Sequence, residues 1–460
     1  MDIRDYPTSR RAVLGGLAAL GAAPFVLRGA WAFATDVDVI IVGAGAAGIG
    51  AAIALKQAGL TARILEADNR IGGRALTDTT TFRGKDGKAV PFDIGCAWIH
   101  RFETGDPFAD WSRKLHFDTQ AHDLGVNRLF YGKTPYSDLM VRFLDEDEDK
   151  AKKAFAGAGD VPASSVITDW DKPMDAAATY MGPMDMGVDF DSLSTADFTA
   201  MDEYDPNYLV REGYGTLVKT VGSQSGLDIV LNAPVTAIDT GGSGVKVTIG
   251  GRHPGALTAR AVIVTVSTGV LASGAIRFPA GLPPATQDAI GDVPMGLLAK
   301  IPLQIPGISH YLDGVQPYYN LLQENAGLDD IYFLAWPWNS DLMVGFVGGK
   351  FGWDLSRKGQ AAAIAYAKDK LSNIFGSDIK RRVRRGLLTP WATNPLARGA
   401  YSAARPGKHA SRAVLAQPVH SRLFFAGEAT APGGMFATCS GAYSAGTQAA
   451  SRIAALLKAG

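Results

Sequence analysis

Three glycines stand in the spacing GxGxxG, directly after an apolar run and directly before a stretch of helical composition: Gly43, Gly45 and Gly48. The apolar run, 37–42, predicts a buried strand, and 46–57 predicts a helix whose free N–H groups attract phosphate. The glycines permit a tight turn, a close approach of backbone to a pyrophosphate, and close packing of helix on strand. A second predicted strand, 62–65, is followed directly by Glu66, which can accept hydrogen bonds from ribose hydroxyls. The pattern predicts a dinucleotide site, with a glycine-rich turn in an ordinary α/β sheet as the alternative.

The segment ILEADNRIGGRALT, at 64–77, bears on which dinucleotide binds. Its glycine pair lets the chain pass close to a long ligand, and Arg74 can place a planar guanidinium on a phosphate. A protein that binds NAD has no general need for this element, so the segment favours FAD. Arg70 precedes the glycine pair. It is expected either to face the pyrophosphate, as Arg74 is, or to lie on the protein surface.

Seven motifs occur in one order along the chain, and together they resemble the flavin-containing amine oxidase family, in its monoamine and polyamine oxidase branches. They are GAGAAG at 43–48, LEADNRIGGRALT at 65–77, FDIGCAWIH at 92–100, REGYGTLVKTV at 211–221, VTVSTGVL at 264–271, FFAGEAT at 424–430 and SGAYSAGTQAA at 440–450. Residues from about 101 to 205 match the family little. The resemblance implies a flavoenzyme.

The resemblance also implies which residues hold FAD. Glu66 would bind the adenosine ribose, Arg74 would approach the pyrophosphate, and the backbone of Val235 would meet the adenine. Glu428 would lie near the ribityl phosphate, and 437–442 would run beside the flavin ring. The expected cofactor-binding set is Gly43, Gly45, Gly48, Glu66, Ala67, Gly73, Arg74, Val235, Trp391, Gly427, Glu428 and Thr438.

Lys300 is the first catalytic candidate. It lies in the apolar stretch PMGLLAKIPLQI, where a lysine is costly to bury without a partner or a role. The resemblance implies that Lys300 lies near flavin N5 and holds a water molecule. The alternative is a strand-edge lysine whose ammonium reaches solvent.

Tyr401 is the second catalytic candidate, in a segment that resembles the family pattern W-x-x-(D/N)-P…G-(S/A)-Y-(S/T) from Trp391 onward. It would form one wall of an aromatic cage in which apolar surroundings favour the neutral amine. The other cage position falls on Thr438, the third catalytic candidate, which is not aromatic. We therefore expect Phe436, or a tryptophan from elsewhere, to complete the cage.

The chain departs from the family pattern at two further places. Monoamine oxidases attach FAD through a cysteine just before the cage tyrosine, and this chain has Ala400 there. The resemblance therefore predicts non-covalent FAD. Relatives often have proline then leucine at the place of Ser267 and Thr268, and this difference has no functional interpretation.

The stretch DIGCAWIH resembles the polyamine oxidase and histone demethylase branch. Trp98 and His100 are the substrate-site candidates from it, with Tyr401 and Phe436. A buried, hydrogen-bonded histidine is the alternative for His100. Polyamine sites usually need carboxylates for distant ammonium groups. The candidates are Glu103 and Asp106, whereas the acidic run at 145–149 favours a solvated face.

The N-terminal segment has the features of a targeting signal. Residues 1–34 contain the twin arginines of SRRAVLGG, an apolar stretch rich in Ala, Gly and Leu, and the small-x-small sequence Ala30-Trp31-Ala32. These features predict a twin-arginine export signal and a periplasmic or secreted location. A short membrane anchor or a disordered tail is the alternative. We expect no membrane span in the mature protein.

Composition excludes several classes of protein. The 460 residues suggest two or three domains, and the 45 basic residues balance the 45 acidic ones. No basic stripe indicates a nucleic-acid partner. The two cysteines, Cys96 and Cys439, form no metal-binding spacing, so no metal site is expected. They could pair in an oxidising compartment or remain free. The sequence indicates no oligomeric state.

The flavin motifs fall at 36–100, 211–270 and 385–460, and they must converge on one cofactor. The sequence therefore predicts a discontinuous α/β, Rossmann-like FAD-binding domain. The intervening blocks, 101–210 and 271–384, are expected to form an α+β substrate domain, as in the two-domain amine oxidases. A sheet would roof the flavin, and the ligand cavity would lie between the domains.

The expected reaction is oxidative deamination of a small-molecule amine through an imine that water hydrolyses. Reduced flavin would be reoxidised by O2, giving hydrogen peroxide, or by an electron-carrier protein. The sequence is consistent with either electron acceptor. It is also consistent with a monoamine, a polyamine or a cyclic amine as the substrate. An L-amino-acid oxidase, which should show an arginine for the substrate carboxylate, and a desaturase are alternatives on the same scaffold. A flavoprotein without turnover is the third alternative.

Overall fold

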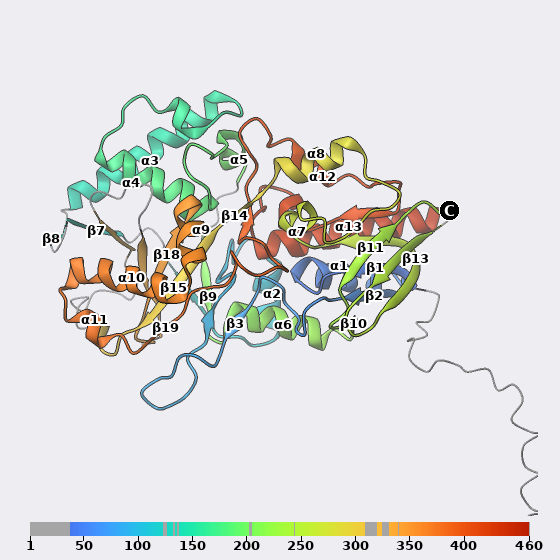
Figure 1. Ribbon diagram of the computed structural model, residues 1–460, viewed down its shortest axis with the longest axis horizontal. Helices are drawn as coiled ribbons and strands as arrows, with labels where there is room; N and C mark the ends of the chain where they lie inside the picture. Colours follow the sequence, from blue (N-terminus) through green and yellow to red (C-terminus); the bar gives the residue numbers. More distant parts are fainter. Residues whose placement is uncertain are drawn as a thin grey trace, which may run out of the picture.

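The computed structural model describes residues 37–122, 127–131, 134–135, 138–201, 205–242, 244–308, 320–323, 331–338 and 340–459. The expected export signal at 1–34 lies outside these residues. Figure 1 shows two lobes side by side, one built on strands β1, β2 and β13, the other on β15 and β18. Across the described ranges, we find no helix of the length and apolar character that a membrane crossing demands.

A seven-stranded sheet forms the dinucleotide lobe, in the order β10-β2-β1-β13-β12-β11, with β21 paired to β13. Its first strand, helix and second strand have the predicted bounds, which confirms that part of the sequence interpretation. The strands are β1 (Val37–Val42), β2 (Ala62–Leu65), β10 (Asp228–Val230), β11 (Val235–Asp239), β12 (Val245–Ile249), β13 (Gly255–Val264) and β21 (Leu423–Phe425). β1 runs parallel to both β2 and β13, so their carboxyl ends meet at one edge.

Helices cover both faces of this sheet. On one face, α1 (Ala46–Gln57) packs against α13 (Cys439–Ala459) through small residues. A Cβ added at Gly446 would stand 1.9 Å from the Ala47 carbonyl oxygen, so this approach requires glycine. The other helices of the lobe are α2 (Pro107–Lys114), α6 (Tyr214–Gln224), α7 (Thr268–Ala272), α8 (Pro284–Asp292) and α12 (Ser411–Leu415).

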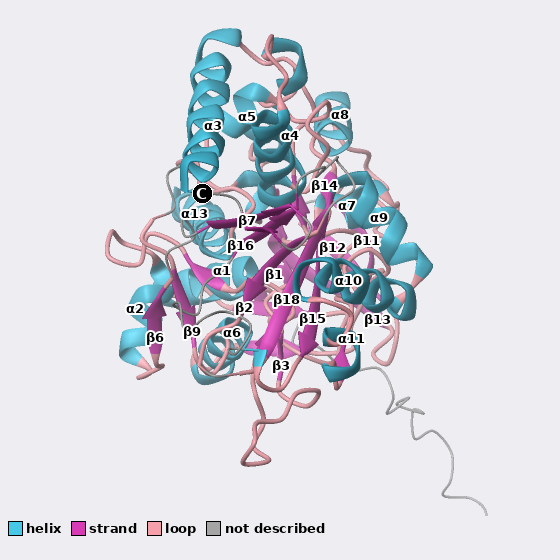
Figure 2. Ribbon diagram, turned by 90° about the vertical axis from the view of Figure 1, so that its left-hand side faces the viewer, coloured by secondary structure: helices cyan, strands magenta, loops and turns pink. Residues whose placement is uncertain are grey.

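A second seven-stranded sheet, ordered β19-β15-β18-β17-β16-β7-β8, forms the other lobe. Its strands are β7 (Asn127–Tyr131), β8 (Thr134–Pro135), β15 (Leu298–Gln304), β16 (Asn320–Gln323), β17 (Tyr332–Ala335), β18 (Leu342–Gly348) and β19 (Arg385–Gly386). Helices α9 (Gly349–Lys358), α10 (Gln360–Phe375) and α11 (Ile379–Arg382) bury one face of it. Figure 2 shows α3 (Asp138–Ala158), α4 (Lys172–Thr179) and α5 (Thr195–Thr199) stacked at one end of the strands.

Short elements join the two lobes. They are β3 (Thr77–Asp78) with β4 (Phe92–Asp93), β5 (Trp98–Ile99) with β9 (Tyr208–Val210) and β6 (Thr119–Ala121), and β14 (Met295–Gly296) with β20 (Tyr401–Ser402). A π-helix, Tyr180–Met186, follows α4 directly. These short strands and the π-helix belong to the segments that lie between the two large sheets.

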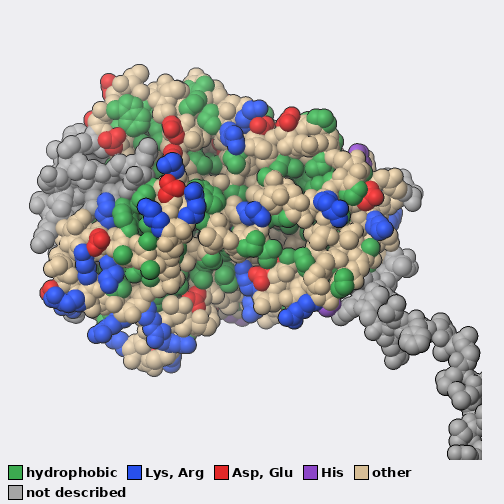
Figure 3. All heavy atoms as spheres, in the orientation of Figure 1, with side chains coloured by type: hydrophobic (Ala, Val, Ile, Leu, Met, Phe, Trp, Pro, Cys, Tyr) green, Lys and Arg blue, Asp and Glu red, His purple; other side chains and the backbone are tan. Residues whose placement is uncertain are grey.

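The packing differs from the expected domain boundaries at three places. Helix α2 lies in the block 101–210 assigned to the substrate domain, but it packs in one apolar cluster with α1 and α6 of the dinucleotide lobe. Residues 271–293 were assigned to the substrate domain, but Leu271, Ile290 and Val293 pack in the same apolar cluster as the dinucleotide sheet. The strand 385–386, assigned to the FAD domain, instead pairs with β15 of the other sheet. Packing, rather than the position of the flavin motifs, sets these boundaries. On the surface, basic and acidic side chains are interspersed over the face in Figure 3, in keeping with the balanced composition.

Candidate functional site

A cavity of about 400 Å³ lies between the two sheets. Val42 and Leu65, at the carboxyl ends of β1 and β2, form part of its wall, and Gly427, after β21, forms another. Lys300 of β15 and Tyr401 of β20 line it from the other lobe. The carboxyl edge of a parallel sheet is the usual place for a dinucleotide.

The glycine turn is shaped to let a ligand approach. Gly43 has φ 106°, in the region that favours glycine, and a Cβ there would stand 2.6 Å from the Thr265 hydroxyl oxygen. Gly43 and Gly45 line the cavity. A Cβ at Gly48 would stand 1.9 Å from the Gly43 carbonyl oxygen, so Gly48 permits the helix to pack on the turn. The residues present fit the pyrophosphate cradle expected from the spacing.

Glu66 ends the second strand with its carboxylate pointing to the turn. Its Oε2 accepts a hydrogen bond from the Ala44 N–H at 2.6 Å, and its Oε1 accepts from the Asp68 N–H at 2.7 Å. Burial raises the pKa of Glu66 above its ordinary value, while these N–H groups act in the opposite direction. Ala67 and Val235 line the same end of the cavity.

Arg74 and Glu428 form an ion pair at the cavity wall. The Arg74 Nη1 donates to Glu428 Oε1 at 2.8 Å and to the Ala400 carbonyl at 2.9 Å. Burial alone would raise the pKa of Glu428, but the Arg74 charge and the Ser402 hydroxyl hold it below the ordinary value. Glu428 is therefore a carboxylate in the folded protein. Gly73 lines the cavity beside this pair.

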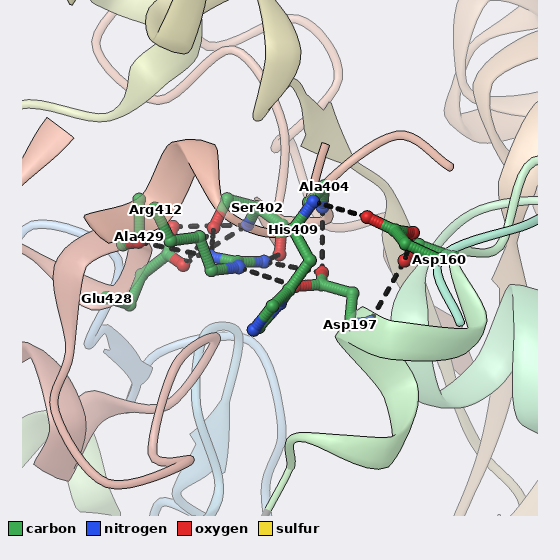
Figure 4. Close-up of polar contacts among 9 residues, drawn as sticks. Asp160, Asp197, Ser402, Ala404, His409, Arg412, Glu428 and Ala429 are labelled. Carbon is green, nitrogen blue, oxygen red and sulfur yellow. Dashed lines mark hydrogen bonds and ion pairs between the residues drawn. The ribbon is translucent and has the colours of Figure 1, made fainter. Parts of the chain in front are cut away.

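A buried network extends from Glu428 into the substrate lobe (Figure 4). Ser402 donates its hydroxyl to Glu428 Oε2 at 2.6 Å and accepts from Arg412 Nη1 at 2.9 Å. Arg412 also holds Asp197 with two bonds, Nε to Oδ1 at 2.7 Å and Nη2 to Oδ2 at 2.8 Å. His409 contacts the same carboxylate. Although burial acts in the opposite direction, these partners lower the pKa of Asp197 to about 2. Sequence reasoning missed this network, because no local motif marks it.

Lys300 is buried, with 5% of its surface exposed, and so is not the solvent-reaching lysine of the alternative interpretation. Its Nζ donates to the carbonyl oxygens of Asp93 at 2.9 Å and Gly95 at 2.5 Å. Burial lowers the pKa of Lys300 to about 8, while the Asp93 charge acts in the opposite direction. A buried amine near neutrality can hold or release a proton at the cavity wall.

Asp93 fixes the segment that receives Lys300. Its Oδ2 accepts from the Tyr214 N–H at 2.9 Å and its Oδ1 from the Gly215 N–H at 3.2 Å, at the start of α6. Thr77 donates its hydroxyl to the same carboxylate at 2.6 Å. Burial raises the pKa of Asp93 to about 6. The sequence interpretation named the segment but not this carboxylate.

The two expected tryptophans and Tyr401 all line the cavity. The Tyr401 hydroxyl donates to the Met184 carbonyl at 3.1 Å. The Trp391 Nε1 donates to the Ile94 carbonyl at 2.9 Å, and the Trp98 Nε1 donates to His122 Nδ1 at 2.8 Å. Hydrogen bonds at the ring edges fix the rings, so their flat faces can bound a ligand.

Thr438 lines the cavity, whereas Phe436 does not. The Thr438 hydroxyl donates to the Met435 carbonyl at 2.7 Å and accepts from the Gly441 N–H at 2.9 Å, so it caps the last helix. Phe436 is buried elsewhere, with its ring 4.2 Å from the Arg412 guanidinium carbon. Phe436 therefore does not complete a cage in this cavity, and the tryptophans that line it are Trp98 and Trp391.

His100 lines the cavity and is hydrogen-bonded, as its alternative interpretation required. Its Nδ1 lies 2.6 Å from Asn207 Oδ1, and burial lowers its pKa. The polyamine carboxylate candidates are both away from the cavity lining. Glu103 is exposed and accepts from the Tyr208 hydroxyl, and Asp106 caps α2.

The acidic run is only partly the solvated face that we expected. Asp145, Glu146 and Asp149 are exposed, but Asp147 is buried. Glu148 is half-buried, and burial raises its pKa to about 7. The amphipathic helix α3 turns part of the run inward, which a count of charges does not show.

The fold and the cavity define a two-lobed protein with a Rossmann-type dinucleotide site. Comparison of the sequence with models of known protein families agrees with this description. Residues 116–454 match the flavin-containing amine oxidoreductases, and residues 41–115 match an NAD(P)-binding Rossmann-like domain. The chain belongs to the flavin-containing amine oxidoreductase family.

Several curated proteins are similar in sequence to this chain over most of its length. Polyamine oxidase 2 of Arabidopsis thaliana is 28% identical over 447 residues, which are 90% of this chain and 87% of that protein. Lysine-specific histone demethylase 2 of Homo sapiens is 27% identical over 451 residues, and the match spans 91% of this chain but 53% of the demethylase. For lysine-specific histone demethylase 1 homolog 3 of Arabidopsis thaliana, 25% identical, the match spans 30% of that protein.

Solved structures share the fold. A wild-type putrescine oxidase bound to putrescine has a TM-score of 0.74 and 21% identity, over 91% of this chain and 99% of that one. Cyclohexylamine oxidase from Brevibacterium oxydans IH-35A has a TM-score of 0.75 and 21% identity, over 92% of this chain and 100% of that one. These matches confirm the predicted two-lobed architecture.

Proposed function

We propose that this chain oxidises a carbon–nitrogen bond of an amine with non-covalently bound FAD. One observation carries the proposal. A single cavity joins a dinucleotide cradle, formed by Gly43, Gly45 and Glu66, to Lys300 and Tyr401 of the other lobe. Such a cavity can hold the cofactor along one wall and a small molecule against the other.

FAD, when bound, takes up the two electrons lost by the amine. The side chains of this protein would bind and orient the amine. Tyr401 and Trp98 offer aromatic faces that favour a neutral amine, because an apolar wall disfavours the ammonium form. Lys300 has three N–H donors as an ammonium, two of which serve Asp93 and Gly95. The third can donate a hydrogen bond to a water molecule at the cavity wall.

We propose a substrate with one amine and an apolar body. The acids among the described lining residues are Glu66, Asp68 and Glu428, all in the cradle segments or paired with them. Glu103 and Asp106 lie outside the lining. A second ammonium would therefore have no carboxylate there to pair with. The similar proteins include both a polyamine oxidase and a cyclohexylamine oxidase, so an experiment on substrate choice has to compare polyamines with cyclic amines.

The amino-acid oxidase alternative is less well supported. It needs an arginine for the substrate carboxylate, and the arginines among the described lining residues are Arg70 and Arg74. Arg70 pairs with Asp68 and donates to the Gly73 carbonyl, and Arg74 pairs with Glu428. Both belong to the cradle end. The desaturase alternative and the flavoprotein without turnover would be favoured if none of a panel of amines, mixed anaerobically with the protein, bleached its flavin.

The mode of flavin attachment has a direct test. Ala400 stands just before Tyr401, where a thioether would need a cysteine. We expect acid precipitation to release all of the flavin into the supernatant as intact FAD. Flavin that stays with the precipitated protein would contradict the non-covalent proposal.

The electron acceptor and the location need separate tests. Stoichiometric hydrogen peroxide per amine would identify O2 as the acceptor, and an electron-carrier protein is supported if air reoxidises the flavin slowly. We also propose export by the twin-arginine route, supported by Arg10, Arg11 and the apolar stretch after them. Replacing both arginines with lysine should keep the protein in the cytoplasm. Unchanged export would contradict this route.

A further inference from the structure

Both cysteines of the chain lie on the wall of the cofactor cavity, although they come from distant parts of the sequence. Cys96 follows the Gly95 carbonyl that receives Lys300. Cys439 is the first residue of α13. Both side chains are partly buried against one apolar cluster, and Cys439 is near enough to raise the pKa of Cys96. The fold therefore brings together two side chains that share a redox chemistry.

The surroundings of Cys96 keep its thiol in the less reactive, protonated form. The neighbouring Cys439 raises the pKa of Cys96 well above its ordinary value, and burial acts in the same direction. The Lys300 charge opposes both effects. Because the thiolate is the reactive form, the raised pKa slows the attack of Cys96 on a disulfide. Two neighbouring thiols can become a disulfide where their Cα atoms lie within about 7 Å of each other.

We propose that Cys96 and Cys439 form a reversible disulfide that ties the segment at 95–96 to the N-terminus of α13 and slows the release of bound flavin. Two S–H bonds break and one S–S bond forms. The two electrons and two protons pass to a small-molecule disulfide, whose own S–S bond is cleaved to give two thiols. The exchange needs no amine, so it stands apart from the proposed oxidation.

The consequence for the cofactor follows from where the bond would lie. Gly95 anchors Lys300 on one side, and Thr438 lines the cavity on the other. A covalent link between these two wall segments opposes their separation, and the proposal is that this slows the exit of bound flavin. A link between distant positions also restricts the unfolded chain strongly.

The first test uses the flavin-loaded protein in glutathione buffers of graded oxidation, approached from reduced and from oxidised protein. We expect both thiols of the denatured sample to disappear together at high glutathione disulfide. Unreduced peptide mapping should show one Cys96–Cys439 link and no glutathione adduct. Cys96→Ser and Cys439→Ser should give no internal link. Two thiols that persist at equilibrium, or two glutathione adducts, would overturn the proposal.

The second test measures how fast flavin is lost to an excess of a flavin-scavenging apoprotein. We expect the oxidised wild type to release FAD several-fold more slowly than the reduced wild type. The two serine variants should release FAD at one rate in both buffers. Equal rates for oxidised and reduced wild type would overturn the effect on flavin release. A protein that forms the link yet oxidises no amine would contradict only the proposed function.

Discussion

Arg412 and Asp197 form a two-pronged, buried ion pair that joins α12 of the dinucleotide lobe to α5 of the substrate lobe. The same arginine donates to Ser402, which in turn donates to Glu428 at the cavity wall. Ser402 follows Tyr401 directly in the chain. The ion pair therefore connects the packing of the two lobes to the position of the proposed cage residue.

Arg412→Met should be strongly destabilising, because it leaves the Asp197 carboxylate buried without its partner. We expect the free energy of unfolding to fall by about 3–5 kcal/mol. The matched control is Arg381→Met, which removes an exposed pair with Asp378 and should cost less than about 1 kcal/mol. Denaturant titration of both proteins makes the comparison. Equal losses for the two variants would mean that the buried pair contributes no more than a surface one.

Glu66→Gln should weaken FAD binding. A neutral amide cannot accept hydrogen bonds from both the Ala44 and the Asp68 N–H groups in this geometry. It also lacks the charge with which Glu66 is proposed to hold a ribose hydroxyl. Hydrogen bonds to charged groups are worth about 1.5–3 kcal/mol, so the dissociation constant should rise roughly tenfold to a hundredfold. Flavin fluorescence during titration of apoprotein measures it. Glu146→Gln, on an exposed part of α3, is the control, and a Glu66 variant that binds like it would refute the ribose role.

Lys300→Met should change how stability depends on pH. Burial lowers the Lys300 pKa from 10.5 to about 8. Between these values the unfolded chain holds a proton that the folded protein lacks, so Lys300 makes the wild type more stable as pH rises from about 8 to 10.5. Below about pH 8 its contribution is constant. The rise is on the order of 3 kcal/mol in total, and Lys300→Met should lack it. Parallel profiles for the two proteins would contradict the assignment.

The same variant should also be catalytically impaired if Lys300 holds a proton or water at the cavity wall. We expect a slower rate of flavin reduction, of reoxidation, or of both, measured separately by stopped flow. The matched control is Lys358→Met, at an exposed end of α9, whose two rates should equal those of the wild type. Unchanged rates in Lys300→Met would remove Lys300 from the mechanism.

Tyr401 offers a test that separates its ring from its hydroxyl. Tyr401→Phe loses the hydrogen bond to the Met184 carbonyl but keeps the aromatic wall. We expect kcat/KM to fall by no more than roughly fivefold, the value of about 1 kcal/mol. Tyr401→Ala loses the wall itself, and a fall of roughly tenfold to a hundredfold is expected. If the Phe variant is impaired as much as the Ala variant, the hydroxyl rather than the ring is what the reaction uses.

Local patterns predicted the dinucleotide half of the molecule well. The strand 37–42, the helix 46–57 and the strand 62–65 have their predicted bounds, because a parallel strand buried on both faces gives a continuous apolar run. The glycine spacing places Gly43 at positive φ, as a tight turn requires. The burial of Lys300 could also be anticipated, since its strand is apolar except for Lys300 itself and Gln304 at its end.

Long-range relationships were not readable in the same way. Asp197 and Arg412 are 215 residues apart, and no local motif marks their contact. Phe436 was misplaced because Ala437, at φ 63°, turns the chain so that the phenylalanine packs on Arg412 while Thr438 faces the cavity. The proximity of the two thiols likewise depends on how α13 packs, which the spacing of the cysteines does not show.

The most direct test of the account is anaerobic mixing of the purified, flavin-loaded protein with a panel of amines while the visible flavin absorbance is followed. The panel should include apolar monoamines, cyclic amines, polyamines and L-amino acids at equal concentration. We predict that an amine with an apolar body bleaches the flavin fastest, and that polyamines and L-amino acids are slower. If dithionite bleaches the flavin and no amine does, the proposed oxidation is wrong.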